Sequence, residues 1–411
     1  MSVEELAVQG RAVRAAARQM ALAPDAQRQG VLHRVAETLD VQTERLVEVN
    51  AADVAAYHDG GPGRDRLVLT PDRVAAMSAT LREVAATPDP LFEVVDRATR
   101  PNGLRVERVR VPLGVIGVVY ENRPNVTSDV AGLCVRSGNA AFLRGSASAF
   151  GSNHFIVDLW RDALVAEGLP ADAVALVADP SHDAAVAFMQ LSGVLDCLIP
   201  RGGPSLIAAM REHARVPYVL DGDGNCHIFL DASAPVDEAV RIVDNAKTSR
   251  PGVCNAVETV LVHRDLAPHV LGALAAAMPS VELRVDEVAA QWLPDALRAT
   301  EHDFATEFLD LILAVRVVDS LDEAIAHVAR YGTGHSEAIV TRDPAHADEW
   351  VRRVDAAAVL VNTSTRFVDG GELGLGGEVG ISTQKLHARG PMGLRELTCL
   401  KWVVRGDGQI R

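Results

Sequence analysis

The sequence of 411 residues has few aromatic residues, an excess of acidic over basic ones, and no cysteine spacing typical of disulfides or metal sites. Its five cysteines are an odd number without a Cys-x-x-Cys pair, which predicts reduced thiols in a cytoplasm. No apolar run approaches the roughly 20 residues that span a bilayer, and the start lacks the basic and apolar regions of a signal peptide. The net charge of −15 argues against nucleic acid or an anionic membrane as the main partner.

The hydrophobic content of 48% supplies ample core material, and the length exceeds one typical core. After a largely helical region of about ninety residues, apolar strand-like runs alternate with helical patterns. The segment 104–111 reads as a half-exposed strand, whereas the apolar segment 114–120 reads as a buried one. This alternation predicts an α/β fold with two doubly wound domains, divided near residues 232–235, and a cleft between them.

One cysteine lies in a segment whose local pattern is unusual. Apolar residues at helical spacing run from Val236 to Thr248, and a β-branched run follows from Val257 to Val262. Pro251-Gly252 ends the helix, which places Cys254 on a tight helix-to-strand connection. Loop residues of this kind are free to face a cleft. The alternative is a small buried side chain, but the neighbouring Pro-Gly and Asn255 favour a functional cysteine.

The run from Asn245 to Glu258, with Cys254 inside it, resembles the active-site segment of the γ-glutamyl phosphate reductases, or glutamate-5-semialdehyde dehydrogenases. They are a phosphate-using branch of the aldehyde dehydrogenase superfamily, and further segments between about residues 111 and 411 support the resemblance in the same order. It implies NADPH-dependent reduction of L-glutamyl 5-phosphate to L-glutamate 5-semialdehyde, in L-proline synthesis. The alternatives are a hydrolytic aldehyde dehydrogenase with another substrate, or a non-catalytic member that uses the fold as a scaffold.

The resemblance also implies a division of the chain. It gives a cofactor-binding domain over residues 1–233, a catalytic domain over 234–393, and a small β oligomerisation arm. The arm would pair a strand within 100–112 with the C-terminal segment 394–411. We therefore expect a homo-oligomer, and functional coupling to a glutamate kinase that supplies the acyl phosphate.

A thiolate suits this chemistry because its thioester keeps the acyl-transfer potential of an acyl phosphate. Lys247 and Arg250 are candidates for favouring the thiolate. The developing oxyanion needs hydrogen-bond donors. The superfamily's oxyanion asparagine, two residues before a proline, corresponds to Asn122, whereas the Arg-Pro-Asn pattern of the reductases points to Asn125, which we favour. The alternative is an asparagine that only caps the following helix.

No Gly-x-Gly-x-x-Gly follows a strand, so the usual dinucleotide fingerprint is absent. The resemblance places the adenosine ribose at a strand end where this chain has Arg144, Gly145 and Ser146, and an arginine there suits the 2′-phosphate of NADP. A second strand-to-helix turn offers backbone donors for the diphosphate. Its candidate residues are Arg201, Gly202, Gly203 and Ser205. Glu307 matches the superfamily glutamate that binds the nicotinamide ribose.

The substrate brings an α-carboxylate, an amine and a phosphate. The candidates for binding it, from segments similar to the substrate side of the family, are Arg123, His335, Arg366, Lys385, His387 and Arg389. The alternative for each cation is a solvated surface charge. Leu220 takes the position of the glutamate base of hydrolytic members, so no carboxylate there would activate water. Asp221 and Asp223 are the nearest possible substitutes.

Overall fold

The computed structural model describes residues 3–58, 62–220 and 222–411, which form two compact units. The first unit consists of the described residues up to Leu220 and of two later segments, Gly374–Gly380 and Met392–Arg411. The second unit consists of the described residues after Leu220 up to Leu373, together with the segment Ile381–Pro391. The roles of cofactor-binding and catalytic domain, assigned to these parts of the chain from the sequence, stay predictions.

The division between the units comes earlier than the residue 233 expected from the sequence. Strand β7 (Cys226–Leu230) pairs in parallel with β8 (Val257–His263) and with β12 (Ser336–Val340). Because all three strands belong to one sheet, the segment that contains β7 is part of the second unit.

The sheet of the first unit has four parallel strands in the order β5-β4-β3-β6. These strands are β3 (Val115–Tyr120), β4 (Ala140–Gly145), β5 (Val174–Leu176) and β6 (Cys197–Arg201). The sequence Val-Ile-Gly-Val-Val-Tyr of β3 is buried throughout, as expected for a central parallel strand. The strand order reverses at β3, which is the arrangement of a doubly wound sheet.

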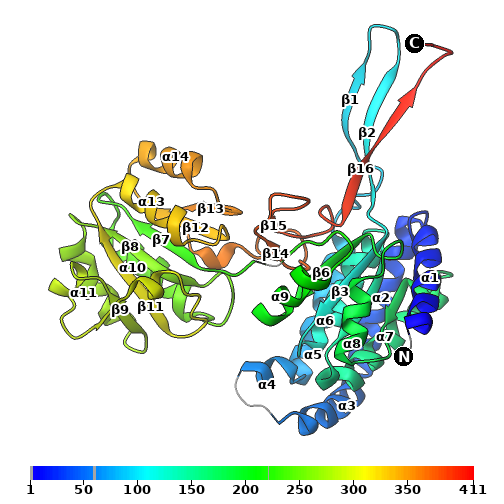
Figure 1. Ribbon diagram of the computed structural model, residues 1–411, viewed down its shortest axis with the longest axis horizontal. Helices are drawn as coiled ribbons and strands as arrows, with labels where there is room; N and C mark the ends of the chain where they lie inside the picture. Colours follow the sequence, from blue (N-terminus) through cyan, green and yellow to red (C-terminus); the bar gives the residue numbers. More distant parts are fainter. Residues whose placement is uncertain (1–2, 59–61, 221) are drawn as a thin grey trace. The chain divides into compact units, whose positions relative to one another are not determined.

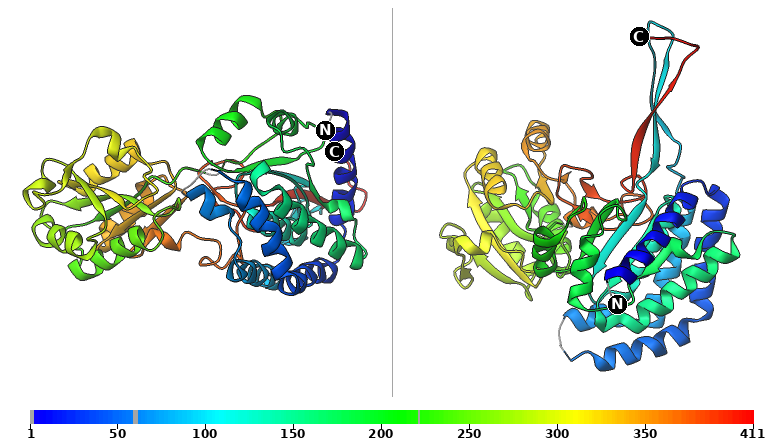
Figure 2. Two further views of the ribbon diagram at one scale, coloured as in Figure 1. Left: turned by 90° about the horizontal axis from the view of Figure 1, so that it is seen from below. Right: turned by 45° about the vertical axis from the view of Figure 1, so that its right-hand side comes forward.

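Helices cover both faces of this sheet (Figure 1 and Figure 2). Helix α5 begins after Thr70, whose side chain accepts a hydrogen bond from the Arg73 N–H, and Pro71 occupies its first position. The helices of this unit are α1 (Val3–Met20), α2 (Asp25–Val41), α3 (Thr43–Ala56), α4 (Pro62–Leu67), α5 (Pro71–Ala86), α6 (Pro124–Arg136), α7 (Phe150–Ala166), α8 (His182–Met189) and α9 (Pro204–His213), with short 3-10 turns at Ala147–Ala149 and Ala171–Ala173.

A separate antiparallel sheet in this unit has the order β1-β2-β16 (cyan and red in Figure 1). The expected pairing is confirmed: β16 (Thr398–Arg405) pairs along β2 (Arg105–Pro112) from Thr398 opposite Pro112 to Arg405 opposite Arg105. Strand β1 (Val94–Thr99) was not predicted. All six of its side chains are exposed, so its sequence lacks the alternation that signals a half-buried strand.

The second unit is built on a sheet of seven parallel strands in the order β10-β9-β11-β8-β7-β12-β13. The strands not yet given are β9 (Glu282–Val285), β10 (Leu297–Arg298), β11 (Ile312–Val318) and β13 (Ala358–Val361), and a small pair is formed by β14 (Ile381–Ser382) and β15 (Gly390–Pro391). The helices are α10 (Val236–Thr248), α11 (Ala267–Ala277), α12 (Glu301–Phe304), α13 (Leu321–Tyr331) and α14 (Pro344–Arg353), with 3-10 turns at Ala289–Gln291 and Thr365–Phe367.

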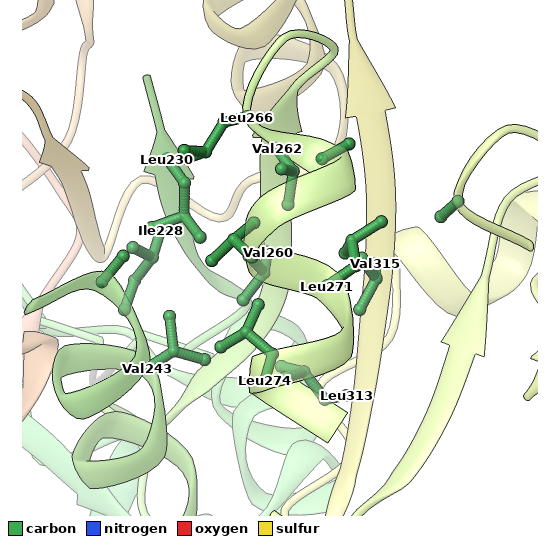
Figure 3. Close-up of a cluster of buried hydrophobic side chains, with 14 of the residues drawn as sticks. Ile228, Leu230, Val243, Val260, Val262, Leu266, Leu271, Leu274, Leu313 and Val315 are labelled. Atoms are coloured by element: carbon green, nitrogen blue, oxygen red, sulfur yellow. The ribbon is translucent and has the colours of Figure 1, made fainter. Parts of the chain in front are cut away.

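The main core of the second unit lies between this sheet and the helices α10 and α11. Figure 3 shows Val243 of α10 and Leu274 of α11 against Val260 of β8, and all three side chains are buried. The two parallel sheets, with helices between their strands, confirm the predicted α/β fold class. No helix in the described part of the chain is both long and apolar enough to cross a membrane.

Candidate active site

The predicted helix-to-strand connection is present in the second unit. Helix α10 ends at Thr248 and strand β8 begins at Val257, so Cys254 lies in the short segment between them. This segment, residues 249–256, is called the thiol loop below. Cys254 is partly exposed, whereas Cys226 is fully buried at the start of β7.

Side chains from the 3-10 turn at Thr365–Phe367 hold the thiol loop. Thr365 Oγ1 donates to the Asn255 carbonyl oxygen at 2.7 Å, and Asn255 Nδ2 donates to the Val368 carbonyl oxygen at 3.0 Å. Arg366 donates from its guanidinium to Asn255 Oδ1, and from Nε to Ser249 Oγ at 3.3 Å. The proposed substrate cation Arg366 therefore lies against the thiol loop. Burial, followed by repulsion from Arg250, lowers the pKa of Arg366.

A glycine packs directly on the backbone of Cys254. A Cβ built on Gly224 would lie 1.6 Å from the Cys254 carbonyl oxygen, so this contact requires glycine. The Cys226 thiol donates to the same carbonyl oxygen at 3.1 Å. The Gly224 N–H donates to Glu307 Oε1 at 2.7 Å. The sequence singled out Cys254 and Glu307, but it did not predict that Gly224 contacts both.

These groups gather where the parallel strands of the second sheet begin. Gly224 precedes β7, Cys254 precedes β8 and Glu307 precedes β11. The predicted site residues of the first unit instead lie at or after the carboxyl ends of their strands, the usual position of ligands in doubly wound sheets.

His335 was predicted to contact the substrate, but its side chain has no exposed surface. Its Nδ1 lies 2.7 Å from Ser336 Oγ and 3.7 Å from the Cys226 thiol. A direct contact with substrate would require these neighbours to move. In this structure His335 supports Cys226, which in turn contacts the thiol loop.

Two of the predicted substrate cations share one carboxylate. Lys385 Nζ lies 2.6 Å from Asp355 Oδ2, and Arg389 Nη2 lies 2.8 Å from Asp355 Oδ1. His387 belongs to the same segment of the chain. An anionic ligand would have to compete with Asp355 for both cations.

In the first unit, the residues after β3 and β4 form one hydrogen-bonded cluster. The Asn122 N–H donates to Ser146 Oγ at 3.1 Å, and the Ser146 and Ser148 hydroxyls both contact Asn122 Oδ1. Asn122 Nδ2 donates to the Tyr57 hydroxyl at 3.0 Å. Asn122 has a φ of +42°, in the left-handed region that asparagine tolerates better than most residues.

The competing oxyanion candidate, Asn125, lies in the first turn of α6. Its Nδ2 donates to Asp129 Oδ2 at 2.9 Å. Arg123, predicted to bind substrate, is the N-cap residue of this helix and forms no side-chain cap. The alternative of a merely capping asparagine is thus not observed, and the choice between Asn122 and Asn125 stays open.

Arg144, at the end of β4, is directed to the segment that precedes α8. Its Nη2 donates to the carbonyl oxygens of Pro180 and Ser181, each at 2.8 Å. Burial lowers the pKa of Arg144, whereas the nearby carboxylates of Asp179 and Glu121 oppose this shift. Arg144 is therefore fixed in orientation before any cofactor binds.

The turn after β6 combines close backbone packing with a helix N-terminus. Arg201 is the last residue of β6 and pairs in register with Tyr120 of β3. A Cβ on Gly202 would lie 2.7 Å from Glu121 Cδ, and the Gly203 N–H donates to Glu121 Oε2 at 3.0 Å. Ser205 lies in the first turn of α9.

This edge of the sheet has two features of a dinucleotide site, although the Glu121 carboxylate occupies the Gly203 N–H. A tight, glycine-lined turn opens α9 beside the strand at which the order reverses, which is where such ligands bind. The backbone at the end of β4 is also closely packed, because a Cβ on Gly145 would lie 2.1 Å from Asn153 Nδ2. Within the described residues, no cluster of three or more His, Cys, Asp or Glu side chains could hold a metal ion.

Comparison with known proteins agrees with the resemblance. The sequence profile of the aldehyde dehydrogenase family matches residues 3–291 and 304–403. The chain is 51% identical to a γ-glutamyl phosphate reductase of Carboxydothermus hydrogenoformans over 401 residues, which cover 96% of this chain and 97% of that protein. It is 50% identical to a γ-glutamyl phosphate reductase of Moorella thermoacetica, with 99% of each chain covered.

The fold is also that of a solved structure. The crystal structure of a γ-glutamyl phosphate reductase from Thermotoga maritima matches with a TM-score of 0.96 and 42% identity, and the match covers 100% of both chains. An acetylating aldehyde dehydrogenase from Geobacillus thermoglucosidasius matches with a TM-score of 0.71 at 17% identity, covering 100% of this chain and 98% of the other. This second likeness concerns the fold alone.

Proposed function

The chain belongs to the γ-glutamyl phosphate reductases within the aldehyde dehydrogenase family, and we propose that it reduces L-glutamyl 5-phosphate to L-glutamate 5-semialdehyde and phosphate. The product serves L-proline synthesis. The observation that carries the assignment is the partly exposed Cys254 in its supported helix-to-strand loop. A non-catalytic scaffold would have no need to shape this loop around a thiol.

Cys254 acts as the nucleophile. Its thiolate adds to the acyl carbon, the bond from that carbon to the phosphate oxygen breaks, and a thioester remains on Sγ. Reduction of this thioester requires a hydride at the acyl carbon, which a bound nicotinamide cofactor would supply. The resulting oxyanion re-forms the carbonyl, which releases the aldehyde and returns the thiolate. The side-chain amide of Asn122 or Asn125 serves as a donor to this oxyanion.

A nicotinamide cofactor follows from membership of the family, and the preference for NADP is our proposal. Arg144 would contact the 2′-phosphate, and its fixed guanidinium lowers the entropy cost of that contact. The turn after β6, with Gly202, Gly203 and Ser205, would face the diphosphate, which would have to displace the Glu121 carboxylate from the Gly203 N–H. Glu307 would bind the nicotinamide ribose.

Phosphate, and not water, is proposed as the partner of the thioester in the reverse reaction. Leu220 stands where hydrolytic members have a glutamate, and its side chain is apolar and 8% exposed. Of the two substitute bases, Asp223 is exposed and Asp221 lies outside the described residues. Phosphate is already anionic and nucleophilic near neutral pH. It needs cations, and Arg366 beside the thiol loop is the best placed.

The decisive experiment is pre-steady-state oxidation of the semialdehyde in phosphate-free buffer. We expect at most one equivalent of NADPH per active site, followed by sustained turnover when phosphate is added. The variant Cys254→Ser is the control, because it cannot form the thioester and should give no burst. Sustained turnover without phosphate would reject the proposal and favour a hydrolytic dehydrogenase.

The three-stranded sheet β1-β2-β16 is proposed as an oligomerisation arm. It exposes the large apolar side chains of Val94, Val95, Trp402 and Val404, which a second copy of the chain would cover. Replacing Trp402 and Val404 together by lysine should lower the mass measured by light scattering. Because acyl phosphates hydrolyse readily, functional coupling to a glutamate kinase also remains part of the proposal.

A further inference from the structure

A buried ion pair flanks the thiol loop. Lys247, in the last turn of α10, and Glu258, the second residue of β8, are joined by 2.6 Å between Nζ and Oε2. Both side chains are 0% exposed. Lys247 precedes the thiol loop and Glu258 follows it, so the pair joins the two ends of the segment that carries Cys254.

The second oxygen of the same carboxylate reaches another part of the site. Glu258 Oε1 accepts a hydrogen bond from the Leu309 N–H at 3.2 Å. Leu309 has a φ of +55° and lies two residues after Glu307, whose Oε1 is bound to the Gly224 N–H. One carboxylate therefore contacts the ends of the thiol loop and the segment that presents Glu307.

Burial disfavours the charged form of both side chains. Burial raises the pKa of Glu258 to about 7, although Lys247 counteracts the shift, and Glu307 adds repulsion. Burial also lowers the pKa of Lys247, which faces Glu258, Asp310 and Cys226. Replacing such a pair by apolar residues of similar size is often neutral or stabilising. Global stability alone thus gives little reason for a buried pair at this position.

We propose that Lys247 and Glu258 are positioning residues for the reaction. The pair fixes the thiol loop and the Glu307 segment relative to each other, so that Cys254 and Glu307 keep one geometry during catalysis. This inference rests on the proposed function, because it assigns the pair a role in that reaction. Neither side chain is exposed, so each acts through its neighbours and not by touching substrate.

The first test separates positioning from stability. Glu258→Gln removes the carboxylate that pairs with Lys247. The double variant Lys247→Met, Glu258→Met removes both charges at similar volume and should fold even if the single variant does not. Asp89→Asn is the matched control, because it breaks the ion pair that Asp89 forms with the buried Arg28 in the first unit, at 2.6 Å. The readouts are the melting temperature and kcat per Cys254 titrated with iodoacetamide, with the labelled peptide identified by mass spectrometry.

We expect kcat per titrated thiol to fall by about 100-fold in the double variant, since a displacement near 1 Å at a reacting group has that effect. Asp89→Asn should lower the melting temperature and leave kcat per titrated site unchanged. A folded double variant whose kcat stays within about threefold of wild type would overturn the inference. Wild-type activity is measured alongside, and its absence would reject the proposed function instead.

A second test asks whether the pair acts through Glu307. The dissociation constant of NADPH is measured for Glu258→Gln, for Glu307→Ala and for the two combined. Residues that work through one another give non-additive effects, so the second substitution should add little to the first. Additive effects would remove the connection to Glu307 from the proposal.

Discussion

Gly224→Ala is the most direct perturbation of the thiol loop that leaves the chemical identity of every proposed reacting group unchanged. The new Cβ would lie 1.6 Å from the carbonyl oxygen and 2.6 Å from the Cα of Cys254. Real Cβ atoms essentially never approach within 3.0 Å, so the two segments have to separate by at least 3.0 − 1.6 = 1.4 Å. Both obstructing atoms belong to the backbone, and no side-chain rotation relieves the overlap.

A shift of this size would move Cys254, the proposed nucleophile, out of its reacting geometry. Misplacement by 1 Å lowers a rate by about 100-fold, which corresponds to about 2.7 kcal/mol of transition-state stabilisation. Overpacking of this kind also reduces the free energy of unfolding by about 1–3 kcal/mol. The hydrogen bond from the Cys226 thiol to the same carbonyl would be disturbed as well.

The assay compares kcat per titrated Cys254 and the melting temperature with those of a matched variant. Gly272→Ala introduces the same methyl group in helix α11, where nothing lies within 4 Å of the new Cβ. It should stabilise the protein by about 0.5–1 kcal/mol and leave kcat unchanged. A folded Gly224→Ala enzyme with kcat within about threefold of wild type would refute the reasoning from this contact.

Three further predictions follow from the site and its surroundings. Cys254→Ser should lose almost all turnover and keep its affinity for NADP; steady-state rates with a binding assay test this, and retained turnover would discard the mechanism. Arg144→Ala should weaken NADPH binding more than NADH binding, since only NADPH carries the 2′-phosphate; equal losses would show another role. Burial, with His227 and Arg316 nearby, lowers the pKa of His327 well below its usual value of 6.5. Below pH 6.5 the unfolded chain therefore binds one proton more at this residue than the folded chain, and the free energy of unfolding falls as the pH drops. In urea unfolding, His327→Gln should reduce this slope by about 1.4 kcal/mol per pH unit, and an unchanged slope would contradict the assignment.

Much of the fold was predictable because its signals are local. The apolar run of β3 and the helix, Pro-Gly and strand pattern around Cys254 each lie within one short segment. The pairing of β2 with β16 connects distant parts of the chain, and it came from the family resemblance, not from local pattern. Strand β1 was missed because its exposed side chains leave no periodic signal.

The site was predictable to the extent that its residues carry their own chemistry. Cys254 was identified from its loop, and Glu307, Arg144 and Arg366 from segments similar to the family. Their partners were not predictable. Lys247, interpreted as an aid to the thiolate, is buried in a pair with Glu258, and Lys385 and Arg389 both contact Asp355.

The sequence by itself determined the α/β class and the family, because residue order and local periodicity are sufficient for each, and it singled out Cys254 as the proposed nucleophile. Only the tertiary structure decided that Gly224 packs on Cys254, that Glu258 joins the thiol loop to the Glu307 segment, and that His335 is buried. The physical reason is that a polar group's partner depends on which strands a parallel sheet places side by side. In the second unit that order joins β7 to both β8 and β12, a neighbourhood that no spacing along the chain records.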